Sequence, residues 1–126
     1  MKKLSILTVM IFMSISLAFA GYYSSYAISS YHYKQFSTSG NANISLYDAN
    51  NKQKGLLIFL AVDPSELPAA SQDANGLVRL YYPSTRLHDV IDLLRNESPL
   101  ALHYWHGSGQ NSHIGTAKRE LVGEGE

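Results

Sequence analysis

The chain contains no cysteine and no excess of charge of either sign, and both absences exclude classes of protein. Without cysteine there is no disulfide, no thiol nucleophile, no thiolate metal site and no cysteine for a lipid anchor. Ten Lys and Arg residues balance ten Asp and Glu residues. Because nucleic-acid binding depends on clustered cations, this balance argues against nucleic acid as a partner.

Long apolar runs are also absent, except at the start of the chain. Lys2 and Lys3 precede an apolar run over residues 4–17, and Ala18 and Ala20 are small residues at the positions that a signal peptidase reads. The run is shorter than the about 20 apolar residues of a membrane span. We therefore expect a signal peptide over residues 1–20, with cleavage after Ala20. The remaining chain, residues 21–126, is expected to be a single small domain, periplasmic or secreted, with no membrane anchoring after cleavage.

The sequence lacks the patterns of known catalytic sites. The Gly-Ser-Gly-Gln-Asn-Ser segment at 107–112 fits neither the nucleophile elbow Gly-x-Ser-x-Gly nor a dinucleotide-binding fingerprint. Asp63, Glu66 and Asp73 are not spaced as in a calcium-binding loop. These observations identify no catalytic residue and no cofactor, and they favour a binding protein over an enzyme.

Alternation of apolar and polar residues predicts a mostly β structure. The predicted strands cover residues 27–36, 42–47, 55–62, 78–82, 100–105 and 114–122. The segment 55–62 is apolar on both faces, so we expect it to be central in its sheet and to form a hairpin with the strand before it. A long loop is expected over 63–76.

A helix is predicted after Pro83, with Ser84 as its N-cap and an end near Asn96. Its apolar residues recur at the i, i+3, i+4 and i+7 positions of one helical face. These residues are Leu87, Val90, Ile91 and Leu94. Short connections favour antiparallel pairing, so the expected fold class is α+β. We predict a small curled antiparallel sheet or partial β-barrel of about five to six strands, with one amphipathic helix packed on it.

Histidines are the main candidates for metal binding, since imidazoles are common ligands of zinc and copper. His103 and His106 lie close together in the sequence, and His113 follows seven residues after His106. Strand alternation places His103 and His106 on opposite faces, whereas His106 and His113 flank a loop and can face each other. The metal-site hypothesis is therefore His106 with His113. The alternative is that these are ordinary surface histidines.

Trp105 is the only tryptophan, and it lies between two histidines just before the glycine-rich segment. An exposed aromatic surface here would suit a peptide or a sugar ring, and the alternative is that Trp105 belongs to the core. We predict a ligand-binding surface with the loop 63–76 as its second wall. The predicted binding residues are Tyr81, His103, Trp105, His106 and Asn111.

The function predicted from the sequence is that of a small exported, non-catalytic binding or interaction protein. Its partner would be an unidentified protein or small molecule of the cell envelope. Three alternatives remain open: an inhibitor of an exported enzyme, a histidine-dependent metal-binding protein, and a structural component of a surface assembly. In the last case the Tyr-rich segment near the N-terminus would pair with an exposed sheet edge of a neighbour.

Overall fold

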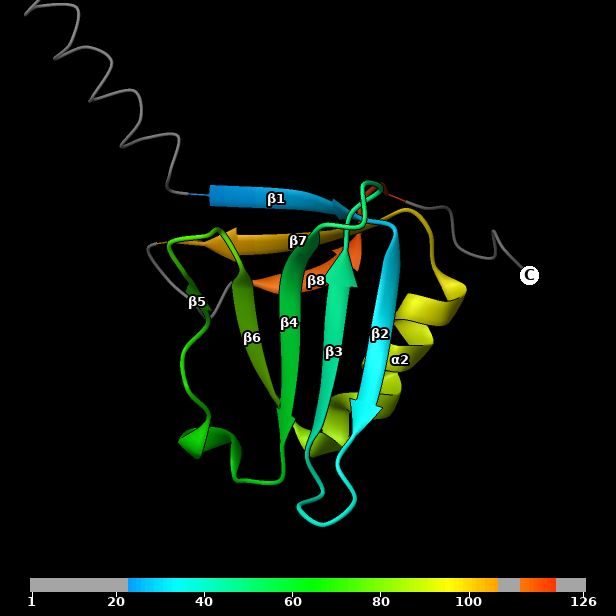
Figure 1. Ribbon diagram of the computed structural model, residues 1–126. Helices are drawn as coiled ribbons and strands as arrows, with labels where there is room; N and C mark the ends of the chain where they lie inside the picture. Colours follow the sequence, from blue (N-terminus) through cyan, green and yellow to red (C-terminus); the bar gives the residue numbers. More distant parts are fainter. Residues whose placement is uncertain (1–22, 107–111, 120–126) are drawn as a thin grey trace, which may run out of the picture.

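The computed structural model describes residues 23–106 and 112–119 (Figure 1). The predicted signal peptide, residues 1–20, and Asn111 lie outside these ranges. The described strands are β1 (Tyr23–Ile28), β2 (Ser30–Gln35), β3 (Ala42–Tyr47), β4 (Gln53–Leu60), β5 (Ser71–Gln72), β6 (Val78–Pro83), β7 (Leu100–Trp105) and β8 (His113–Thr116). A single described α-helix, α2 (Leu87–Asn96), lies between β6 and β7.

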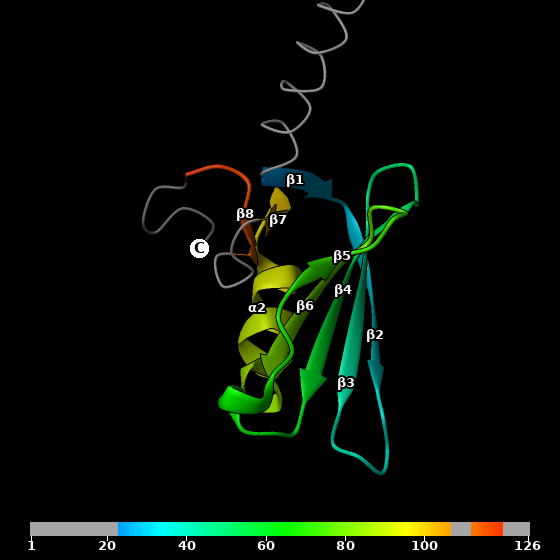
Figure 2. The ribbon, with the colours of Figure 1, turned by 90° about the vertical axis from the view of Figure 1, so that its left-hand side faces the viewer.

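The elements form two layers. The front layer is a five-stranded sheet in the order β2-β3-β4-β6-β5, and the back layer contains α2 and a three-stranded sheet in the order β1-β7-β8. Figures 1 and 2 show the strands of the back sheet running crosswise behind the front sheet, above α2. All strand pairs are antiparallel except β4 and β6, which run parallel.

The alternation of buried and half-buried residues along β3 and β4 gives the front sheet one face that packs into the core. Ala42, Ile44 and Leu46 are buried and alternate with half-buried residues, and Leu57 and Phe59 are buried in the same way. The two strands form the expected antiparallel hairpin, and β4 is the middle strand of its sheet. The predictions of this hairpin and of a central position for the strand at 55–62 are confirmed.

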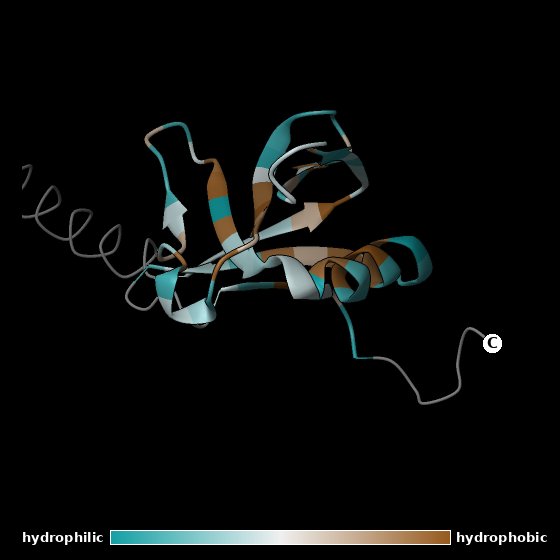
Figure 3. Cartoon of the chain, turned by 90° about the horizontal axis from the view of Figure 1, so that it is seen from below, coloured by the Kyte–Doolittle hydropathy of each residue, from teal (hydrophilic) through white to brown (hydrophobic). Residues whose placement is uncertain are grey.

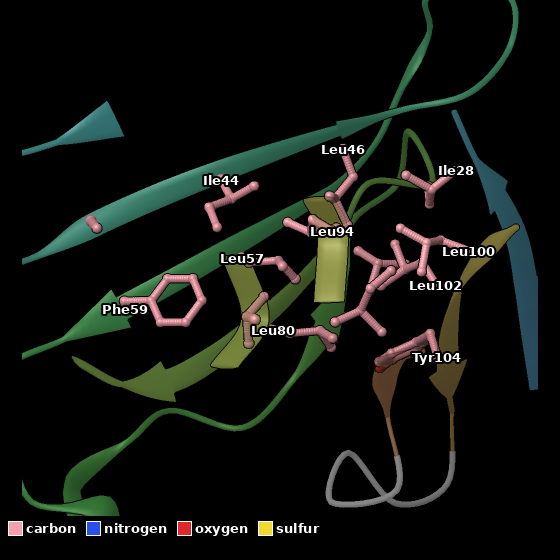
Figure 4. Packing of buried hydrophobic residues seen from close by; sticks show 14 residues of the cluster. Ile28, Ile44, Leu46, Leu57, Phe59, Leu80, Leu94, Leu100, Leu102 and Tyr104 are labelled. Carbon is pink, nitrogen blue, oxygen red and sulfur yellow. The ribbon is translucent and has the colours of Figure 1, made fainter. Parts of the chain in front are cut away.

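The core lies between the two layers (Figure 4). Its front side is formed mainly by β3, β4 and β6, and its back side by β1, β7, β8 and α2. The largest fully buried side chains are Phe59, Ile44, Leu46, Leu57, Leu102 and Val78. Burial of such side chains stabilises the fold by about 1.5–3 kcal/mol each. With no disulfide, this core is the main source of stability.

The predicted helix is confirmed, but its predicted N-cap is wrong. Val90 and Leu94 are buried in the core, and Figure 3 shows hydrophobic and hydrophilic residues alternating along α2. Ser84 instead begins a 3₁₀ turn, in which its carbonyl oxygen accepts a hydrogen bond from the backbone N–H of Leu87. The turn therefore takes the place of a side-chain cap. Within the described residues, no helix is long and apolar enough to cross a membrane.

The α+β class is correct at the coarse level, whereas the single curled sheet or partial barrel is wrong. The described strands form two separate sheets, eight strands in all, that do not close into a barrel. The strand expected over 27–36 is interrupted at Ser29, whose backbone N–H donates to the carbonyl of Tyr47 over 2.8 Å. This interruption sends β1 into the back sheet and β2 into the front sheet.

Two other boundaries also differ from the expectation. The loop 63–76 contains a 3₁₀ turn at Pro64–Glu66 and the short strand β5. The closing strand, expected over 114–122, is β8 and ends at Thr116. The loop therefore contributes an edge strand to the front sheet and is not structureless.

Gly55 of β4 packs against Leu102 of β7, and this contact between the layers allows a test of the packing. A Cβ atom at Gly55 would lie 2.5 Å from Cδ2 of Leu102 and 3.3 Å from Cδ1 of Leu46. We predict that Gly55→Ala lowers the free energy of unfolding by about 1–3 kcal/mol, because the core has no space for the methyl group. Urea denaturation measures this change.

Gly115→Ala is the matched control for this substitution. The nearest atom to a Cβ at Gly115 is Cδ2 of His113, at an ordinary contact distance of 3.5 Å. We expect little change in stability for this variant. Equal losses for the two variants would contradict the close approach at Gly55.

Candidate functional site

A cleft of about 820 Å³ lies beside β6, and we call it the loop–β6 cleft. One wall is formed by residues between Pro64 and Ala70, and the other by Leu80, Tyr81 and Tyr82. Ser112, just before β8, also lines it. None of the lining residues carries a charge. The structure thus brings Tyr81 and the long loop together, as the two walls of one cleft.

Two aspartates hold the ends of the loop. Oδ1 of Asp63 accepts hydrogen bonds from the backbone N–H and the hydroxyl of Ser65, at 3.1 and 3.0 Å. Oδ1 of Asp73 accepts from the backbone N–H of Leu77 at 3.0 Å, and Oδ2 pairs with Arg79 at 3.1 Å. The backbone N–H groups of Ser65 and Leu77 are the largest causes that lower the pKa values of Asp63 and Asp73. Both carboxylates therefore serve the loop structure as anions.

The main chain of β6 is left open where it borders the cleft. β5 pairs only with Val78 and Arg79. The backbone N–H of Asp73 donates to the carbonyl of Leu77 over 3.0 Å, so the main-chain groups of Leu77 face the edge of β6 that pairs with β5. Every second residue after Leu77 turns its N–H and C=O toward the same edge. Tyr81 is the second such residue after Leu77, and it lies beyond the end of β5. No described hydrogen bond joins its main chain to the loop.

Tyr82 lines the inner side of the cleft, and its side chain contacts both sheets. Its ring stacks on Phe59 with 5.3 Å between ring centroids. Burial raises the pKa of the Tyr82 hydroxyl, and the backbone N–H of Ile114, which donates to it, acts in the opposite direction. Tyr82 thereby connects β6 of the front sheet with β8 of the back sheet.

A second group of aromatic side chains lies on the outer face of the back sheet, and we call it the histidine–aromatic cluster. Its members are Tyr23, His103, Trp105 and His113. His103 lies directly opposite His113 in the β7–β8 pair, with 4.6 Å between the ring centroids. Tyr23 stacks on His103, and its hydroxyl contacts Nδ1 of that ring. The rings of Tyr23 and Trp105 pack edge to face, with 5.3 Å between their centroids.

The described contacts of His106 are with residues of β1 and β7. Its Nε2 lies 2.8 Å from Oγ of Ser24, and its ring packs edge-on against Tyr104. The described ring that faces His113 is that of His103. Among residues 23–106 and 112–119, no group of three or more His, Cys, Asp or Glu side chains is placed to hold a metal ion. The metal site of His106 with His113 therefore stays a prediction.

Three of the predicted binding residues are thus divided between two places. Tyr81 lines the loop–β6 cleft, whereas His103 and Trp105 belong to the histidine–aromatic cluster. One link connects the two: the backbone N–H of Trp105 donates to Oγ of Ser112, which lines the cleft. Sequence reasoning missed Tyr23 and Ser112, because only strand pairing brings them to these places.

The Ser24–His106 contact has the distance of a nucleophile and its base. A third group that orients the histidine is part of such a site, and the described contact of the His106 ring is with Tyr104. This pair therefore carries no argument for hydrolysis.

No protein-family model matches this chain, and neither the curated proteins nor the solved structures contain a match. Any function is therefore argued from the cleft, the cluster and the sheet edges.

The cluster generates a prediction about pH. Burial, followed by the charge of a protonated His113, lowers the pKa of His103 from its ordinary value near 6.5. The folded state therefore binds this proton less readily than the unfolded state, and acidification through pH 6.5 destabilises the fold. We predict a lower unfolding temperature at pH 5.5 than at pH 7.5, measured by circular dichroism. The His103→Gln variant should show a smaller difference.

His88→Gln is the control, because His88 is exposed on α2. Asp48, Asp63 and Asp73 do not interfere, since their lowered pKa values keep them ionised throughout this range. A full pH dependence in His103→Gln would show that the histidine pair does not cause it.

Proposed function

We propose that this chain is a small exported, non-catalytic binding protein whose ligand occupies the loop–β6 cleft. One observation carries the proposal: the main-chain N–H and C=O of Tyr81 face a cleft whose lining side chains are uncharged. Its volume of about 820 Å³ lies within the usual range of ligand sites, about 300–1,000 Å³. Export is proposed from the pattern of residues 1–20.

The chemistry of the cleft favours an extended, uncharged peptide segment. Such a segment can exchange two hydrogen bonds with the main chain of Tyr81, as an added strand would. Leu67, Pro68 and Leu80 supply apolar contacts for its side chains. A charged group would lose its hydration here without gaining an ionic partner from the lining residues. The bound segment would lie where the loop departs from β6.

The non-catalytic assignment rests on the same residues. The titratable side chains that line the cleft are those of Tyr81 and Tyr82, and burial raises the pKa of Tyr82. A hydroxyl of this kind stays protonated at neutral pH and is a poor general base. The lining residues therefore favour recognition over proton transfer.

The experiment is a selection of peptides from a random displayed library with the chain that begins at Gly21. We expect the selected peptides to be uncharged, and Tyr81→Ala to weaken their binding by about tenfold or more through loss of ring contacts, equal to about 1.4 kcal/mol. Tyr31→Ala is the matched control, because Tyr31 is an exposed tyrosine on β2, away from the cleft. Isothermal titration measures the affinities.

A readout of the main chain tests the site independently of the side chain. On peptide binding, the amide resonance of Tyr81 should shift more than that of Leu80, whose N–H points toward β4. Peptides that bind Tyr81→Ala normally but lose affinity for Trp105→Ala would move the site to the histidine–aromatic cluster and contradict the proposal.

A further inference from the structure

β1 is an edge strand that has a neighbour on one side only. In the back sheet the order is β1-β7-β8, so β7 covers one edge of β1. Figures 1 and 2 show β1 at the top of the molecule, with its other edge directed away from both layers. A groove of about 300 Å³ runs beside it, lined by Ser25, Tyr26 and Ala27 and by the β3–β4 turn. The free edge is therefore accessible to an added strand.

Exposed edges usually carry a feature that prevents pairing, such as short length, a charge, a proline or a covering element. Among the described edge strands, β5 has two residues and β8 has four. β2 carries the charged residue Lys34. β1 has six residues, Tyr-Ser-Ser-Tyr-Ala-Ile, with neither a charge nor a proline. Among the described edge strands, β1 therefore has the fewest features that prevent pairing with another strand.

The direction of the β1 main-chain groups follows from the hydrogen bonds of β7. The backbone N–H of Ala117 donates to the carbonyl of Pro99 over 2.8 Å, so alternate residues of β7, counted from Pro99, bond to β8. The intervening residues of β7 bond to β1. By the β1–β7 register, the N–H and C=O groups of Tyr23, Ser25 and Ala27 consequently face the free edge.

We propose that a second copy of this chain pairs with that edge. Two β1 strands lie antiparallel about a two-fold axis at Ser25, so that Tyr23 of each copy is opposite Ala27 of the other. All three free residues of each strand then exchange hydrogen bonds, about six in total. A register shifted by two residues in either direction leaves one of these three residues of each strand without a partner in the other β1 strand. The result is a continuous six-stranded sheet made of two back sheets.

The side chains of β1 are self-complementary in this register. Tyr23 lies opposite Ala27 on the outer face, and Tyr26 lies opposite Ser24 on the inner face. Each large side chain thus meets a small one, and cross-strand contacts of aromatic residues stabilise sheets by about 0.2–1 kcal/mol. No like charges meet, because β1 has no charged side chain. This match favours a second copy over an unrelated partner.

The absence of cysteine allows a direct test of the register. In Ser25→Cys, the two introduced thiols lie on Cα atoms about 5.5 Å apart, within the range for a disulfide. In Tyr23→Cys they lie roughly 13 Å apart, beyond that range. We expect mild oxidation of the chain beginning at Gly21 to give a covalent dimer at least about tenfold faster for Ser25→Cys, as seen on non-reducing gels. Equal rates, or no cross-linking, would overturn the proposal.

A second pair of variants tests dimerisation without cross-linking. Ser25→Pro removes an N–H that faces the free edge and leaves the β1–β7 hydrogen bonds intact, whereas Ser25→Ala keeps the N–H. We expect sedimentation equilibrium to show dimers for the wild type and Ser25→Ala, and monomers for Ser25→Pro with an unchanged far-ultraviolet spectrum. A monomeric wild type at its highest soluble concentration, or a dimeric Ser25→Pro, would disprove pairing through β1.

Discussion

The contact of Leu102 with the backbone of Gly55 sets the spacing of the two layers on which the rest of the structure depends. β4 is the middle strand of the front sheet and β7 is the middle strand of the back sheet. A residue without Cβ at the crossing lets the fully buried Leu102 reach the front sheet. β6, which borders the cleft, and β1, which has the free edge, are direct neighbours of these two middle strands.

The elements that could be predicted from the sequence are those with a local cause. α2 follows from apolar residues at helical spacing, and the β3–β4 hairpin follows from two apolar segments with a turn between them. The separation of β1 from β2 has no such signal, because both strands contain the same β-favouring residues. At Ser29 the chain passes from the back sheet to the front sheet, where its N–H bonds to the carbonyl of Tyr47, far along the chain. The parallel pairing of β4 with β6 likewise depends on the path of the intervening loop.

The candidate site shows the same division between local and long-range causes. Proline and glycine residues predict an irregular loop over 63–76. Its length led to the prediction that this loop forms one wall of a ligand-binding site. The placement of His103 directly opposite His113 instead depends on the register between β7 and β8. A register is specified by which side chains enter the core, here Leu102 opposite Ile114, and spacing in the sequence does not reveal it. The spacing in the sequence therefore suggested His106 as the partner of His113, whereas the described register places His103 opposite it.

Both proposed interactions arise from the same physical cause, namely a strand whose main-chain N–H and C=O groups have no partner on one side among the residues that the structure describes. At Tyr81 the cause is the two-residue length of β5, and at β1 it is the edge of the back sheet. The first opening lies between the loop and β6 and presents the main chain of one residue, so it suits one short segment. The second spans a whole strand and suits an equal strand. Because they lie on different sheets, pairing through β1 leaves the cleft of each copy open. A dimer would then present two clefts, and a ligand with two suitable segments would gain avidity from their fixed spacing.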